Sequence, residues 1–154
     1  IAGKHDNDFG AMRTALRESG LGNRIKLKNF VSQADLSALY IRADLFVWPS
    51  VYEGWGLPPL EALASGVPTI VSDGGSLPEV VGEAGVIVPF IEKDVSKRKD
   101  DEAFEIKLAE TMRAVLTDLV QQKVLGLAGP KRAAKFTWRA VAEKTLEIYK
   151  KVAG

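Results

Sequence analysis

Two short, uninterrupted apolar segments, DLFVWP at residues 44–49 and VPTIVS at residues 67–72, most strongly restrict how this chain can fold. Runs of this length without polar alternation are typical of strands that are buried on both faces of a parallel sheet. The residues between them predict a helix, because two prolines at positions 58 and 59 suit its first turn and Gly66 ends it. The sequence therefore predicts a βαβ unit and an α/β fold.

The same alternation continues on both sides of this unit. The spacing of apolar residues predicts strands over 24–31 and 86–88, and helices over 8–20, 32–41, 76–79, 102–122 and 137–152, with a short helix before residue 136. Serines at positions 32 and 76 and a threonine at 137 suit helix caps. Residues 90–101 are charged and aperiodic and predict a solvated loop.

We expect one domain over residues 1–154, a Rossmann-like parallel sheet with flanking and C-terminal helices. Its opening residues, IAGK, resemble the tail of a strand, so the chain is expected to begin inside the fold.

Composition excludes several classes of site. The 154 residues contain no cysteine and one histidine, His5, so neither disulfides nor a metal site is expected. No apolar run reaches membrane-spanning length and no signal peptide is evident, which is compatible with a cytoplasmic protein. Residues 93–154 carry 14 basic and 9 acidic groups, against 7 and 11 in residues 1–92. Because the basic residues are interleaved with acids, nucleic acid is not an expected partner, while weak peripheral contact with anionic lipids at the cytoplasmic membrane face is left open.

The stretch most suited to chemistry is EGWGLPPLE, residues 53–61, which lies between two predicted parallel strands. Ligands of open α/β sheets bind beyond the carboxyl ends of the strands, where such loops lie. Gly54 and Gly56 let the backbone approach a ligand closely, and the helix that follows is expected to direct free N–H groups at it. These features predict a seat for a phosphate or diphosphate.

Two carboxylates, Glu53 and Glu61, bracket this seat. Neither favours contact with a phosphate, but an ionised carboxylate accepts hydrogen bonds from hydroxyl groups such as a ribose diol. A diphosphate with hydroxyl groups at both ends describes a nucleotide sugar. The alternative is purely structural: glycine-rich turns before helices are common, and Glu61 could simply favour the helix dipole.

The segment also resembles the signature of retaining GT-B glycosyltransferases of family 4, in which two acids stand either side of a seven-residue spacer. The resemblance extends to DLFVWPS before it, to EALASGVPTIVSD and GGSLPEVVGEAGVIV after it, and to FTW and EIY near the end. It implies one half of a GT-B fold, the C-terminal donor-binding domain, here without its first strand-helix unit.

The resemblance also implies a role for each site residue. Glu53, the catalytic residue, would hold hydroxyls of the donor sugar, and Glu61 would hold the ribose. The stretch Gly54, Trp55, Gly56 and Leu57 would meet sugar and diphosphate, and Phe30 and Val31 would contact the base. The donor would be a GDP- or UDP-hexose, mannosyl or glucosyl being favoured, with no metal and no further cofactor. Whether Glu53 attacks the sugar covalently or only positions it is open, and positioning is favoured.

In such enzymes the active site forms between two domains, so the resemblance implies a missing N-terminal acceptor-binding domain as partner. The family's arginine and lysine for the diphosphate would precede Ile1, and Lys4 lies in the wrong unit to replace them. An isolated chain is then expected to bind donor at most weakly. A non-catalytic nucleotide-sugar-binding module and a glycosidase with two acids remain as alternatives, the second because paired carboxylates also hydrolyse glycosides.

Four further residues have competing interpretations. His5 is read as a loop residue rather than a general base, and Asp73 as shaping the turn after its strand rather than contacting ligand. Trp48 is expected in the strand core, and Trp138 as the apolar anchor of the last helix. For Trp55 two roles are open: lining the sugar side of the cleft, or covering the loop.

Overall fold

The structure is a computed structural model that describes residues 9–28 and 30–153. It contains two compact units, Ile1–Leu39 and Tyr40–Gly154, which are described separately. The proposed strand tail at residues 1–4 and His5 lie outside the described residues.

The first unit contains helix α1 (Phe9–Glu18), the 3₁₀ turn η1 (Gly22–Arg24) and most of helix α2 (Gln33–Arg42). The predicted cap at Ser32 is confirmed: its hydroxyl accepts a hydrogen bond from the Asp35 amide at 3.2 Å and donates one to the Asp35 carboxylate at 2.8 Å. The predicted strand over 24–31 is wrong for the described residues, where only Lys28 makes a bridge.

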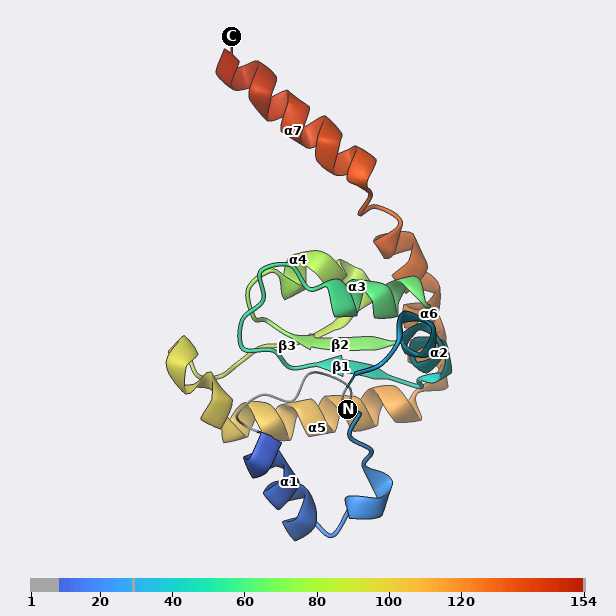
Figure 1. The fold of residues 1–154 in the computed structure, drawn as a ribbon, viewed down its shortest axis with the longest axis vertical. Helices are drawn as coiled ribbons and strands as arrows, with labels where there is room; N and C mark the ends of the chain where they lie inside the picture. Colours follow the sequence, from blue (N-terminus) through green and yellow to red (C-terminus); the bar gives the residue numbers. More distant parts are fainter. Residues whose placement is uncertain (1–8, 29, 154) are drawn as a thin grey trace. The chain divides into compact units, whose positions relative to one another are not determined.

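The second unit contains the sheet, and the predicted α/β fold is confirmed there. Strands β1 (Phe46–Trp48), β2 (Thr69–Ser72) and β3 (Val86–Val88) pair in parallel in the order β1-β2-β3. Helix α3 (Leu57–Ala64) connects β1 to β2, and α4 (Leu77–Val81) with the turn η2 (Gly82–Ala84) connects β2 to β3. Figure 1 shows α3 and α4 over one face of the sheet and α5 (Glu102–Thr117) under the other.

Strand β2 forms the centre of the core, since all four of its residues are buried. Neighbouring side chains along a strand point to opposite faces. Ile70 accordingly packs with Phe90, Phe104 and Val115 on the α5 side, whereas Val71 packs with a second cluster on the α3 and α4 side (Leu63, Leu77, Val81 and Ala84). This burial on both faces explains the unbroken apolar run in the sequence.

The chain after β3 differs in three respects from its predicted form. Residues 90–101, predicted as loop, include the 3₁₀ helix η3 (Val95–Asp100). The single helix predicted over 102–122 is two, α5 and α6 (Leu119–Ala133), and Asp118 caps the second by accepting a hydrogen bond from the Gln121 amide at 2.9 Å. The short helix predicted before residue 136 is therefore the long helix α6.

The last helix, α7 (Trp138–Ala153), begins as predicted, because the Thr137 hydroxyl accepts a hydrogen bond from the Ala140 amide at 3.1 Å. None of its residues is buried in the described chain, however, and Trp138 is 89% exposed. The prediction that Trp138 anchors this helix to a core is wrong for the unit as described. The apolar side chains of α7 stay largely exposed, although Trp138 and Val141 at its start line a pocket together with Trp55. No helix within 9–28 or 30–153 combines the length and the hydropathy needed to cross a bilayer.

Candidate functional site

Two loops meet beyond the carboxyl ends of neighbouring parallel strands, residues 49–56 after β1 and residues 73–76 after β2. The carbonyl oxygen of Glu53 accepts hydrogen bonds from both the amide and the hydroxyl of Ser76, at 3.1 and 3.2 Å. The hydroxyl of Ser72, at the end of β2, donates to the carbonyl of Ser50. The backbone that carries Glu53 is therefore fixed by the second loop.

Gly75 makes this contact possible. A side chain at this position would overlap the Glu53 carbonyl oxygen, and Gly75 has a φ of +62°, which glycine adopts far more readily than other residues. Ser76 is the N-cap residue of α4 as predicted, but its side chain makes no capping bond to the helix. The Ser76 hydroxyl donates to the Glu53 carbonyl instead, so this side chain makes a tertiary contact in place of a capping hydrogen bond.

Each of the two acids is held by a neutral aromatic donor. The indole Nε1–H of Trp48 donates to Oε1 of Glu53 at 2.9 Å, and the Tyr40 hydroxyl donates to Oε2 of Glu61 at 3.1 Å. Both carboxylates are half-buried. Neither has an ion-pair partner in the described part of the chain. In each carboxylate the second oxygen accepts no hydrogen bond from the described residues.

The phenol of Tyr40 is itself strongly perturbed. Burial raises its pKa well above the usual value, and the negative charge of Glu61 and the hydrogen bond to it raise the pKa further. A raised pKa keeps the hydroxyl protonated, so Tyr40 remains a donor to Glu61 throughout the physiological pH range.

The turn between the two acids carries unused backbone donors. Within the described chain, the amides of residues 54–57 donate to no protein acceptor. Gly54 is exposed, and Gly56 is buried at the start of α3. The turn is thus not closed by its own hydrogen bonds, and an anion could be bound by these four N–H groups.

The helix itself contributes less than the sequence indicated. Pro58 and Pro59 do fall in the first turn of α3 as predicted, but proline has no N–H, and the amide of Leu60 is already bonded to Gly56. Of the free N–H groups expected in the first turn of α3, only that of Leu57 is left to bind a ligand. Glu61 is the fifth residue of α3 and lies in its second turn.

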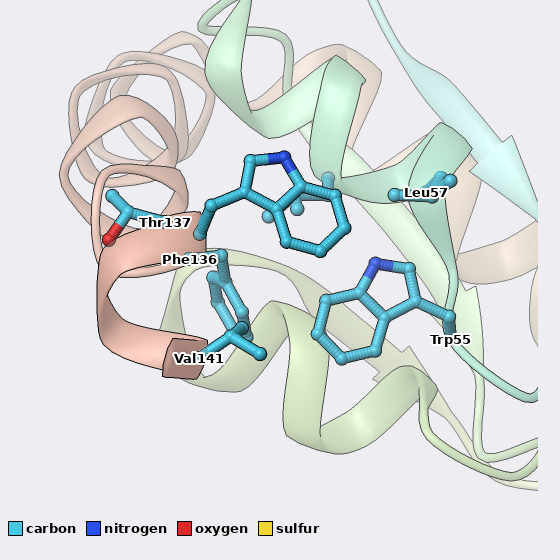
Figure 2. Close-up of a pocket in the computed structure, with 7 residues that line it drawn as sticks. Trp55, Leu57, Phe136, Thr137 and Val141 are labelled. Carbon is cyan, nitrogen blue, oxygen red and sulfur yellow. The ribbon is translucent and has the colours of Figure 1, made fainter. Parts of the chain in front are cut away.

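Beside the turn lies an apolar pocket of about 510 Å³ that includes neither Glu53 nor Glu61. Figure 2 shows the Trp55 ring directed toward Phe136 and Val141 across this pocket. The rings of Trp55 and Phe136 meet edge to face with centroids 6.0 Å apart, and the Arg132 guanidinium lies 5.0 Å from the Phe136 centroid. Trp55 is 45% exposed, so it packs against Phe136 and is also partly open to solvent.

The remaining candidates are described one by one. Asp73 has a structural role: its carboxylate accepts from the Phe90 amide at 3.1 Å and lies 3.9 Å from Arg98. Phe30 and Val31 belong to the first unit, where Phe30 is 91% exposed. In the described residues no group of three His, Cys, Asp or Glu side chains is arranged to hold a metal ion.

Sequence reasoning missed Tyr40, Trp48 and Ser76 as parts of the site. Trp48 was expected in the strand core, and it does pack against the Leu63 cluster, but the polar edge of its ring serves Glu53. The signal that was available is general: a partly buried tryptophan or tyrosine usually finds a partner for its polar atom.

Comparison with known proteins places the chain in a family. The sequence profile described as Glycosyl transferases group 1 matches residues 1–118. The chain belongs to the glycosyl transferases group 1 family. It is 41% identical over 113 residues to the alpha-maltose-1-phosphate synthase of Mycolicibacterium smegmatis, covering 71% of this chain and 28% of that protein. It is 35% identical over 126 residues to O-antigen chain mannosyltransferase B of Escherichia coli, covering 82% of this chain and 30% of that protein.

A solved structure gives the same assignment for the fold. The sucrose-phosphate synthase from Thermosynechococcus elongatus superposes with a TM-score of 0.75 and 28% identity, covering 98% of this chain and 37% of the other. This glycosyltransferase domain thus spans about a third of the length of these relatives, and it matches the C-terminal part of GT-B enzymes.

Proposed function

We propose that this chain is the donor-binding part of a retaining hexosyltransferase that uses a GDP- or UDP-hexose, with mannosyl or glucosyl transfer favoured. In this proposal Glu53 holds the hydroxyls of the hexose at the reacting end and Glu61 holds the ribose. The amides of residues 54–57 bind the diphosphate between them, and Phe30 and Val31 contact the base. Sugar transfer itself requires a second, acceptor-binding domain that completes the cleft.

The observation that carries the proposal is the run of four unused amides at residues 54–57, with a half-buried carboxylate on each side. Amides suit the charged bridge of a nucleotide sugar, and carboxylates suit its hydroxyl groups. Because Trp48 donates to Oε1 of Glu53, the lone pairs of that oxygen are partly engaged, which supports positioning of the sugar over covalent attack by Glu53. The names of two relatives, an alpha-maltose-1-phosphate synthase and an O-antigen chain mannosyltransferase, agree with a hexose as the transferred group.

Titration of the chain with UDP-glucose and GDP-mannose tests the assignment. We expect Glu61→Ala to weaken binding about 10- to 100-fold, because a hydrogen bond from a hydroxyl to a carboxylate contributes roughly 1.5–3 kcal/mol. Glu83→Ala is the matched control, since Glu83 is exposed and precedes β3, at the opposite edge of the sheet. Affinity can be measured by calorimetry or by ligand-observed NMR.

The outcomes separate the alternatives. Equal affinity of the Glu61→Ala and Glu83→Ala variants would contradict the role of Glu61. A glycosidase would instead hydrolyse a simple aryl glycoside, and we expect no such hydrolysis by this chain. A non-catalytic binding module would bind donor equally well but would give no transfer when the chain is joined to the remaining part of a relative.

A further inference from the structure

Three aromatic rings connect the donors that hold the two acids. Tyr40 and Phe46 meet edge to face with centroids 5.5 Å apart, and Phe46 stacks on Trp48 at 5.9 Å and an interplanar angle of 14°. Phe46 and Trp48 are two residues apart on β1, so their side chains share one face of the strand. We name these three residues the aromatic row.

One end of the row fixes Glu53. The indole has a single N–H donor, and Trp48 uses it on Oε1 of Glu53 at 2.9 Å. The ring of Trp48 also packs against the cluster around Leu63 and Val71, which limits its movement. With the Glu53 carbonyl bound by Ser76, both the backbone and the side chain of this residue are held, and Oε2 accepts no hydrogen bond from the described residues.

The other end of the row fixes Glu61. The Tyr40 hydroxyl reaches Oε2 of Glu61 across the start of α3, and Tyr40 is only 7% exposed. A buried ring in contact with Phe46 has few alternative rotamers, so the direction of this hydrogen bond is set by packing. The two carboxylates are therefore held by separate donors, Trp48 and Tyr40, and both of these rings pack against Phe46.

Resting on the donor-binding function proposed above, we infer that Trp48 and Tyr40 are positioning residues, Trp48 for the sugar-holding Glu53 and Tyr40 for the ribose-holding Glu61. Neither touches the donor. Each presents one carboxylate oxygen to it in a fixed direction, and preorganised groups bind better than groups that must be ordered on binding. Because the acids serve different parts of the donor, loss of the two positioning bonds gives two different binding defects.

The experiment compares nucleotide sugars with nucleotides. Trp48→Phe retains an aromatic ring beside Phe46 and removes the N–H, and Tyr40→Phe retains its ring and removes the hydroxyl. We expect Trp48→Phe to weaken binding of UDP-glucose or GDP-mannose at least about fivefold while binding of UDP or GDP is unchanged, because these lack the hexose. We expect Tyr40→Phe to weaken binding of all four compounds. Tyr149→Phe is the matched control, since Tyr149 is 67% exposed on α7.

The inference is overturned if Trp48→Phe lowers the affinity for nucleotide and nucleotide sugar equally, or if Tyr40→Phe matches Tyr149→Phe. A purely structural role would give the first of these results together with a lower unfolding midpoint. Midpoints of urea unfolding are therefore measured for each variant.

A second measurement needs no ligand and keeps the inference separate from the proposed function. The chain has three tryptophans, so a ¹H–¹⁵N spectrum shows three indole signals, and Trp48→Phe identifies the signal of Trp48. Glu53→Ala should shift that signal upfield and speed its exchange with water, and leave the signal of Trp138 in place. An unchanged Trp48 signal would overturn the inference. If no nucleotide or nucleotide sugar binds the wild-type chain while the Trp48 signal responds, the proposed function fails and the Trp48–Glu53 bond stands.

Discussion

At the scale of single residues, Asp101 shows how one carboxylate can organise several segments. One of its oxygens accepts from the amides of Glu92 and Ile91 at 2.7 and 2.8 Å, and the other accepts from the amide of Phe104 at 3.0 Å. The bond from the Glu92 amide is the main reason that the pKa of Asp101 is lowered, with the Phe104 and Ile91 amides adding to it against the opposing effect of burial. The segment after β3 is thereby tied to the start of α5.

A lowered pKa has a defined effect on stability. A carboxyl group whose pKa is lower in the folded state stabilises the protein above its unfolded value of about 3.9, and this stabilisation is lost as the pH falls through the folded value. We expect Asp101→Asn to be less stable than wild type at neutral pH, with the difference narrowing as the pH falls to about 3. Urea unfolding across this pH range measures it, and a constant difference would contradict the assignment.

At the scale of elements, the junction between α5 and α6 depends on Asp118. Its carboxylate accepts from the Gln121 amide, one of the unpaired N–H groups of the new helix. We expect Asp118→Ala to lower the free energy of unfolding by about 0.5–2 kcal/mol, and Asp118→Ser, which preserves a capping oxygen, to lower it much less. Urea unfolding of the two variants is the test, and equal losses would show that the cap is not what stabilises this junction.

The same junction shows what the sequence could and could not predict. The βαβ core was predictable, because the apolar run around Ile70 reflects burial on both sheet faces. The break at Asp118 was not, because Val115 and Leu119 keep a helical spacing across it. In the candidate site, the two acids stand out by their spacing, but their partners Tyr40 and Trp48 do not. The Tyr40–Glu61 bond joins residues of two helices that are far apart in the sequence, and the Trp48–Glu53 bond depends on the path of the loop that follows β1.

At the scale of the whole molecule, stability resides in the sheet of the second unit. Ile70 is fully buried in the central strand, whereas Ile148 on α7 is 59% exposed. We expect Ile70→Ala to cost about 2–5 kcal/mol of unfolding free energy and Ile148→Ala to change it by no more than about 0.5 kcal/mol. Chemical unfolding of the matched pair provides the measurement. A large loss for Ile148→Ala would mean that the apolar face of α7 is covered in solution.

The contact of Gly75 and Ser76 with the Glu53 backbone bears on how such enzymes can be re-engineered. Suppose that residues 49–57 alone are replaced by the matching segment of a relative in order to change the donor preference. The new segment would then meet the native Gly74-Gly75-Ser76 turn, and any difference in its backbone path would displace Glu53. Residues 49–57 and 73–76 should therefore be exchanged together when chimeras are made.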